Sequence, residues 1–114
     1  DHVQIKTRLV EGKNHAFTLG LQKFNHPEFE IYDLEDEQVE LAGKFLLGLA
    51  QAAFKGERVG VGDVVGDPEA AVKVAAGGLD KGQWEGIPCL ELIASGKGTT
   101  GEAISLWWQK NRPQ

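Results

Sequence analysis

Apolar and polar residues alternate along the first third of the chain. Residues 3–10 read VQIKTRLV, in which the apolar side chains fall on one side of an extended backbone and the charged ones on the other. The same period of two returns over residues 15–21, after a turn that contains Gly12. It returns once more over residues 29–34, after Pro27 has broken the preceding segment. The pattern predicts three strands, the first two joined as a hairpin.

Residues 35–54 carry the most regular pattern in the chain, with apolar side chains at steps of three and four. The resulting stripe consists of Val39, Leu41, Ala42, Phe45, Leu46, Leu49, Ala50 and Ala53. Asp36 is a candidate N-cap, and Lys55 and Gly56 supply a stop signal. We therefore predict a long amphipathic helix whose apolar side lies flat on a sheet, with residues 38–54 as its body.

The second half of the chain predicts shorter elements. Residues 58–65 interleave valines with glycines, which indicates a strand or a bulged loop. Residues 72–74 favour a short strand and residues 89–94 favour another. Residues 77–88, which contain several glycines, are predicted to form a loop.

Thr99 and Glu102 form a capping-box pair ahead of a short apolar run, so a short C-terminal helix is expected. Together these elements predict an α+β fold. It has a mostly antiparallel sheet of about five or six strands packed against one long helix, with the short helix at the C-terminus. A chain of 114 residues has the usual size of one domain, so residues 1–114 are predicted to form a single domain.

The charge of the chain narrows its expected partners. With 12 Lys and Arg residues against 17 Asp and Glu residues, the net charge is −5. The basic residues are scattered, whereas binding to phosphate backbones needs them clustered, so no nucleic-acid partner is expected. No apolar run approaches the ~20 residues that cross a bilayer, so no membrane partner is expected either.

Cys89 is the only cysteine, which excludes an internal disulfide and favours a cytoplasmic location. The chain contains no methionine and opens at Asp1, so a processed form or a piece of a longer protein is expected. Neither observation indicates an activity.

Acidic side chains concentrate between residues 28 and 40. Glu28 and Glu30 lie two apart on one face of a predicted strand, where they could pair for acid–base chemistry, although exposed carboxylates are expected. Asp33, Asp36 and Glu37 follow them. One interpretation is a negative surface that attracts a basic partner protein. The alternative is a solvated loop and the first turn of a helix, where carboxylates interact favourably with the helix dipole.

Trp107 and Trp108 are adjacent and would lie about 100° apart on a helix. One of them is expected to pack in the core beside Ile104, and the other to be an exposed anchor for a partner. Core packing alone is the alternative that the sequence leaves open.

Residues 96–101 read GKGTTG, a G-x-G-x-x-G pattern between a predicted strand and a predicted helix. Backbone N–H groups at such a helix start can bind an anion, and Lys97, Gly98, Thr99 and Thr100 would be the candidates. Only thirteen residues follow, which leaves no room for the next strand and acidic residue of a dinucleotide site. A flexible connector is therefore expected, and an anion pocket is the alternative.

The chemical roles of His15, His26 and Cys89 stay open. No pair of these residues has a metal-ligand spacing, so no metal and no other cofactor is expected. Folding could still bring His15, His26 and Glu28 together as a ligand set. Cys89 could be a nucleophile beside a histidine, although a cysteine in such a strand pattern is more often a small buried side chain. No catalytic set is complete.

Residues 15–31, HAFTLGLQKFNHPEFEI, resemble a segment of uncharacterised bacterial domain families. Those families carry a T-hydrophobic-G-hydrophobic…F-G-x-P-E-hydrophobic-E-I segment, then a long amphipathic helix and a turn like residues 62–66. The resemblance covers about residues 14–74. It depends on Thr18, Gly20, Pro27, Glu28 and Glu30, with Asn25 in place of the usual glycine. It implies an α+β fold and no catalytic residue.

Small acidic bacterial domains of this kind often occur near secreted-toxin and immunity loci, so the resemblance implies a partner-binding role. We therefore expect a non-enzymatic protein-interaction module, such as an immunity-type or regulatory protein. It would bind and occlude a toxin or a parent polypeptide. The alternative is a small-anion or nucleotide-binding domain that uses residues 96–101, with hydrolytic chemistry.

Overall fold

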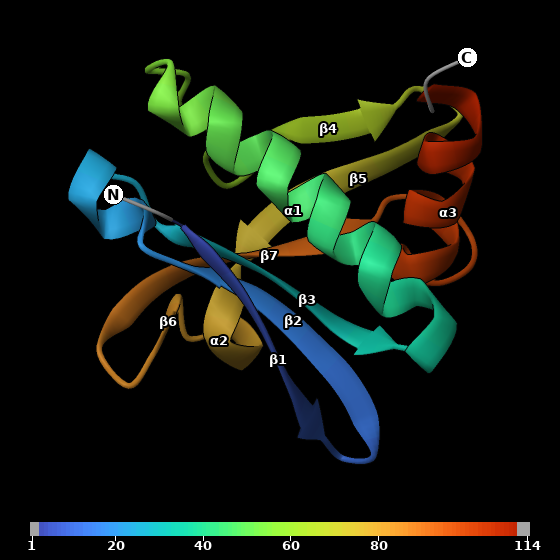
Figure 1. The fold of residues 1–114 in the computed structure, drawn as a ribbon, viewed down its shortest axis with the longest axis horizontal. Coiled ribbons are helices and arrows are strands. Elements are labelled where there is room, and N and C mark those ends of the chain that lie inside the picture. The colour runs from blue at the N-terminus through green and yellow to red at the C-terminus, as the bar shows by residue number, and fades with distance from the viewer. Residues whose placement is uncertain (1–2, 112–114) are drawn as a thin grey trace.

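The chain folds as an α+β structure, and the computed structural model describes residues 3–111 (Figure 1). Its regular elements follow one another along the chain and include two short 3-10 turns, η1 and η2. In order they are β1 (Gln4–Val10), β2 (Lys13–Leu19), η1 (Leu21–Phe24), β3 (Glu28–Leu34), η2 (Asp36–Gln38), α1 (Val39–Phe54), β4 (Val64–Asp67), β5 (Ala70–Ala76), α2 (Gly77–Asp80), β6 (Gln83–Trp84), β7 (Ile87–Ala94) and α3 (Thr100–Asn111).

Seven strands in the described part of the chain form one mixed sheet with the order β1-β2-β3-β7-β5-β4, and β6 pairs with β7 outside this path. The α+β class, the long helix and the short C-terminal helix are confirmed. Two details differ from the prediction. The sheet has more strands, because β6 forms inside a predicted loop. It is also not purely antiparallel, because β3 and β7 run in parallel. Period-two alternation places side chains on faces but carries no strand direction.

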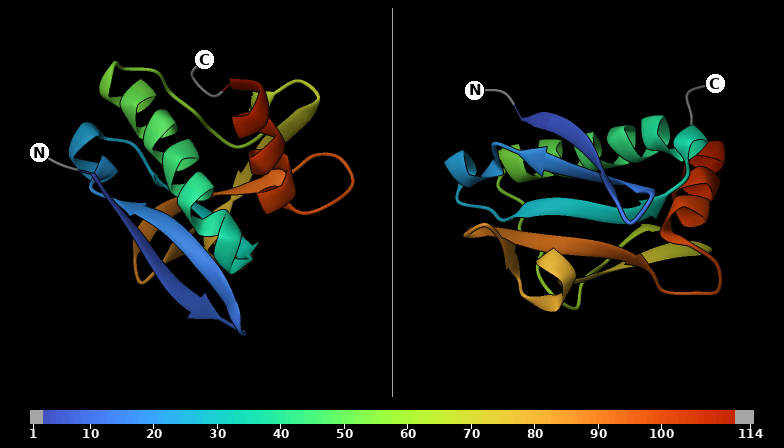
Figure 2. Two further views of the ribbon diagram at one scale, coloured as in Figure 1. Left: turned by 45° about the vertical axis from the view of Figure 1, so that its right-hand side comes forward. Right: turned by 90° about the horizontal axis from the view of Figure 1, so that it is seen from below.

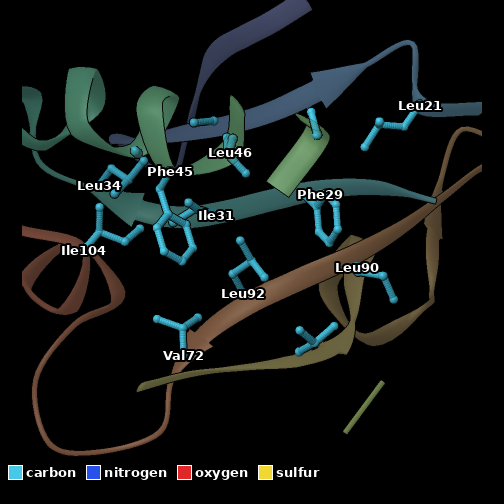
Figure 3. Packing of buried hydrophobic residues seen from close by; sticks show 14 of the residues in the cluster. Leu21, Phe29, Ile31, Leu34, Phe45, Leu46, Val72, Leu90, Leu92 and Ile104 are labelled. Carbon is cyan, nitrogen blue, oxygen red and sulfur yellow. The ribbon is translucent and has the colours of Figure 1, made fainter. Parts of the chain in front are cut away.

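α1 lies across one face of the sheet (Figures 1 and 2). Phe45 and Leu46 are buried and point from α1 toward Ile31 of β3 and Leu92 of β7 (Figure 3). Ile104 of α3 closes the end of the same core (Figure 3). The predicted helix and its apolar contact with the sheet are therefore confirmed. No helix in residues 3–111 is long and apolar enough to cross a membrane.

The start of α1 differs from the prediction. Asp36 is not an N-cap, because residues 36–38 form the 3-10 turn η2 ahead of the helix. The side-chain oxygen of Gln38 accepts the backbone N–H of Glu35 at 2.9 Å. The Asp36 carboxylate instead accepts a hydrogen bond from Asn14 Nδ2 at 2.7 Å. Asp36 thus holds the tip of the β1–β2 hairpin against the helix entry.

Two further segments differ from the structure that the sequence predicted for them. The predicted strand over residues 58–65 is mostly a turn, because β4 begins only at Val64 and Gly60 N–H donates to Asp63 Oδ2 at 2.9 Å. The predicted loop over residues 77–88 contains α2 and β6. These two elements cover the face of the sheet opposite α1 (Figure 2, right).

The start of α3 is as predicted. Thr99 N–H donates to Glu102 Oε1 at 2.8 Å, and Glu102 N–H donates to Thr99 Oγ1 at 3.1 Å. This reciprocal pair is the predicted capping box.

Candidate functional site

The face of the sheet that α2 and β6 cover carries a group of polar side chains, which we call the polar cluster. Successive side chains of a strand point to opposite faces, so residues from four neighbouring strands meet here. The polar cluster consists of Arg8 from β1, His15 from β2, Glu30 and Tyr32 from β3, and Cys89 from β7. It brings a carboxylate, an imidazole, a phenol and a thiol together beside one guanidinium.

Glu30 is the centre of the polar cluster and has no exposed surface. Its carboxylate accepts hydrogen bonds from His15 Nε2 at 2.7 Å, from Cys89 Sγ at 3.4 Å and from the backbone N–H of Gly78. Burial pushes the pKa of Glu30 upward, but the hydrogen bonds from His15, Gly78, Tyr32 and Cys89 outweigh it and lower the pKa. Glu30 is therefore a buried, ionised and fully hydrogen-bonded carboxylate.

His15 is buried, and both of its ring nitrogens are engaged. Nδ1 accepts a hydrogen bond from Arg8 Nε at 2.9 Å, so the ring proton of the neutral imidazole lies on Nε2, which donates to Glu30. The ring stacks on Tyr32 at 4.2 Å and on Phe17 at 4.9 Å between centroids. His15 therefore connects Arg8 to Glu30 and has no nitrogen left for a substrate.

Cys89 is only 2% exposed. Burial, and then the negative charge of Glu30, raise the pKa of its thiol to about 12. The thiolate is the nucleophilic form of cysteine, so Cys89 is unreactive at neutral pH in this arrangement. Of the two interpretations left open, the structure favours the small buried side chain.

Glu28 is a second carboxylate with no exposed surface. It accepts hydrogen bonds from Thr18 Oγ1 at 2.8 Å and from the backbone N–H groups of Gly20 at 3.1 Å and Leu21 at 3.2 Å. Thr18 Oγ1 also accepts the N–H of Phe29 at 2.9 Å. Thr18, Gly20 and Glu28 thus tie the start of η1 to the start of β3.

The prediction that Glu28 and Glu30 lie on an exposed acidic surface is wrong. Each carboxylate finds at least three hydrogen-bond donors inside the protein, and these compensate the cost of removing its charge from water. The two side chains are therefore not part of a surface that a partner protein could contact.

His26 is also engaged inside the protein. Its Nδ1 donates to the carbonyl of Pro27 at 2.8 Å, and its Nε2 accepts the N–H of Val59 at 3.2 Å. It therefore fastens the turn before β3 to the loop after α1. Across residues 3–111 we find no group of three or more His, Cys, Asp or Glu side chains placed to hold a metal ion, so the His15, His26 and Glu28 set does not form.

Asp33, Asp36 and Glu37 are exposed and lie with Glu35 around the tip of the β1–β2 hairpin. We call these four residues the acidic end. Lys13 forms an ion pair with Glu35, whose hydrogen bond and charge raise the pKa of the lysine, and the charges of Asp33 and Glu37 add to this effect. One ammonium thus faces three of these four carboxylates, so the acidic end keeps a net negative charge.

A hollow of about 270 Å³ lies between the acidic end and the polar cluster. It is lined by Tyr32, Asp33, Glu91, Ile93, Ala94, Gly98, Thr99 and Thr100. Tyr32 belongs to the polar cluster, and Asp33 belongs to the acidic end. The glycine-rich turn of residues 96–101 therefore forms one wall of an acidic hollow.

The two adjacent tryptophans pack against α1. The Trp107 ring meets Phe45 edge-on at 4.9 Å between centroids, which confirms that one tryptophan contacts the core. The Trp108 ring is partly buried under Lys44, whose Nζ lies 4.2 Å from the ring centroid. A partner-binding role for Trp108 remains a prediction.

The candidate anion site at the start of α3 is already occupied by a carboxylate of the same chain. Glu102 Oε1 takes the N–H of Thr99, and the hydroxyl of Thr100 accepts the N–H of Ala94 at 3.0 Å. Lys97 is exposed on the turn. A phosphate at this position would have to displace Glu102, so the geometry gives the anion pocket little support.

Sequence reasoning missed Arg8, Tyr32 and the pair Gly77–Gly78. A side chain at Gly77 would overlap Glu30 and would lie 2.8 Å from Cys89 Sγ, so only glycine fits there. Two glycines directly after a predicted strand are a signal of such close approach. Nothing in the sequence, however, links them to a carboxylate 48 residues away.

Comparisons of the chain with protein-family models, with curated proteins and with solved structures find no match. The resemblance of residues 15–31 to uncharacterised bacterial families stays a prediction. A proposal about function therefore has to depend on the geometry of the polar cluster, the acidic end and the hollow.

Proposed function

We propose that this protein is a non-enzymatic interaction module that binds a basic partner protein through the acidic end and the adjacent hollow. The observation that carries the proposal is the excess of carboxylates around Lys13, next to a hollow lined by Asp33 and Glu91. Lysine and arginine side chains of a partner are the complementary groups. Tyr32 supplies an aromatic wall along which their aliphatic stems can pack.

The state of the polar cluster supports a role other than catalysis. A general base needs a free acceptor within reach of its substrate, and a nucleophile needs a lowered pKa. His15 uses both nitrogens internally, and the pKa of Cys89 is raised rather than lowered. These groups act as a buried support for the sheet and for Tyr32, which lines the hollow.

The expected partner exposes a positively charged surface, as proteins that act on anionic substrates do. Covering that surface would occlude the partner, which is the action of an immunity-type or regulatory protein. Electrostatic recognition of this kind speeds association and weakens as salt increases. Salt sensitivity is therefore part of the proposal.

The test compares two doubly substituted proteins as bait. Asp33→Asn with Glu37→Gln removes two charges from the acidic end. Asn tolerates the positive φ of 60° at position 33, and Asp36 is left intact because it holds the hairpin. Glu57→Gln with Glu85→Gln removes two exposed charges elsewhere and is the matched control.

Proteins captured from a native lysate by the unmodified chain are identified, and each binary complex is then measured by calorimetry at two salt concentrations. We expect a partner with Kd below about 1 µM, weakened by about tenfold or more in the acidic-end double variant and unchanged in the control. Equal binding by both double variants, or no partner tighter than micromolar, contradicts the proposal.

A further inference from the structure

Residues 77–86 comprise α2, β6 and the turns around them, and we call this segment the strap. It lies on the sheet face opposite α1 (Figures 1 and 2), where Gly78 N–H donates to Glu30 of the polar cluster. Its own fold is closed by a hydrogen bond from Gly82 N–H to the Gly77 carbonyl at 2.6 Å. The carbonyl of Gly82 in turn accepts the N–H of Cys89 at 3.1 Å. The strap is thus a compact unit that is seated on β7.

Few interactions fasten the strap to the rest of the sheet. Gly78 N–H donates to the Glu30 carboxylate. The Trp84 ring meets the Phe17 ring edge-on, with 5.0 Å between the ring centroids. The Arg8 guanidinium lies 5.6 Å from the Trp84 ring centroid. β6 pairs with β7 over only two residue pairs. β7 has longer pairings with β3 and β5, so it remains in the sheet without β6.

Two observations indicate that the strap can leave the sheet. Leu79 has left-handed backbone angles, with φ of 57°, which strains a non-glycine residue, and it is 64% exposed, so its side chain gains little burial in return. The indole N–H of Trp84 is buried and meets no hydrogen-bond acceptor among residues 3–111. Opening would let water satisfy this donor.

We propose that the strap is a latched cover that swings open as a unit, with the hydrogen bond between Glu30 and Gly78 as its latch, and that it controls access to Cys89. In the closed state Cys89 lies under the strap, 2% exposed, and cannot react. In the open state the thiol and the Glu30 carboxylate face solvent while α1 and the core stay packed. This inference does not depend on the proposed partner binding.

The test measures how fast Cys89, the only cysteine, reacts with a chromogenic disulfide reagent in increasing urea below the unfolding transition. Local opening exposes little surface, so the labelling rate should change with urea by less than about half of the slope for global unfolding. A labelling rate with the full global slope would overturn the proposal, because the thiol would then be reached only by complete unfolding.

Two glycine substitutions provide the matched pair. At Gly77 an added Cβ would overlap Glu30 Oε2 and would lie 2.8 Å from Cys89 Sγ, both outside the strap, which forces the strap off its seat. At Gly96, which is exposed and like Gly77 has no positive φ, an added Cβ meets nothing within 4 Å. We expect Gly77→Ala to label at least about tenfold faster than Gly96→Ala while the helical circular dichroism signal is retained. Equal labelling of the two variants contradicts the latch, and if Gly77→Ala does not fold, the urea series on the unmodified chain decides alone.

Discussion

The two faces of the sheet are built in different ways. The face under α1 is apolar and continuous, with Leu46 and Phe45 packed on Phe29, Ile31 and Leu92. The opposite face holds a charged, hydrogen-bonded group under a ten-residue strap. The first face depends on contact area, which many side chains share. The second depends on a few directional contacts, so a single substitution can disconnect it.

The largest expected effect is on the apolar face. Leu46→Ala should lower the free energy of unfolding by about 3 kcal/mol, because Leu46 has no exposed surface and its truncation leaves a cavity. Leu47→Ala, one position along and 41% exposed, is the control and should cost below about 1 kcal/mol. Urea denaturation measures both. Similar losses for the two variants would mean that α1 does not present its Leu46 side to the sheet.

Glu30→Gln probes the polar face. It should destabilise the protein by about 2 kcal/mol at pH 7, because a charged acceptor of several buried hydrogen bonds becomes neutral. Glu37→Gln is the exposed control and should change stability by less than about 0.5 kcal/mol. Chemical denaturation of the unmodified protein and of both variants measures the two changes. An unchanged stability of Glu30→Gln would contradict the central role of this carboxylate in the polar cluster.

The stability of the same variant relative to the unmodified protein should depend on pH. The pKa of Glu30 is lowered below its ordinary value of 4.5, so its stabilising contribution is fully present above that pH and is lost as pH falls through the folded-state pKa. The stability difference between the unmodified protein and Glu30→Gln should therefore shrink on acidification below pH 4.5. The loss caused by Leu46→Ala should stay constant over the same range. A difference that grows toward low pH would contradict the assignment.

Thr18→Val tests the hydrogen bonds that hold Glu28. It should cost about 1.5 kcal/mol, because the Phe29 N–H loses its acceptor and Glu28 Oε1 loses one of its two donors while the volume is kept. Thr7→Val at an exposed position of β1 is the control and should be close to neutral. Thermal and urea unfolding report both changes, and equal behaviour of the two variants would refute the role of Thr18.

The smallest effect is expected at the glycine-rich turn. Phosphate and nucleotides should not change the melting temperature, because Glu102 already takes the N–H of Thr99. A bound anion at 100 times its Kd would stabilise the protein by about 2.7 kcal/mol, which a thermal-shift screen detects easily. Saturable stabilisation that Lys97→Ala abolishes would restore the anion-binding alternative.

Sequence patterns predicted the apolar face well and the polar face poorly. The stripe of α1, the β1–β2 hairpin and the capping box of α3 each depend on residues within a few positions of one another, so each was readable. Glu28 and Glu30 show the limit. As carboxylates on an alternating strand they predicted an exposed surface, and the donors that make their burial stable come from β2, the turn before η1 and the strap.

The sequence by itself determined the long helix with its apolar side, the β1–β2 hairpin and the capped start of α3, because these features depend on patterns that repeat over two to four residues. Only the tertiary structure decided that β7 lies parallel to β3, and that Glu30 meets Gly78 across 48 positions. Only it placed Asp33 beside Glu91 in one hollow. Hydrogen bonds and charges act over a few ångströms in space, and no period along the chain records which distant segment will supply the other partner.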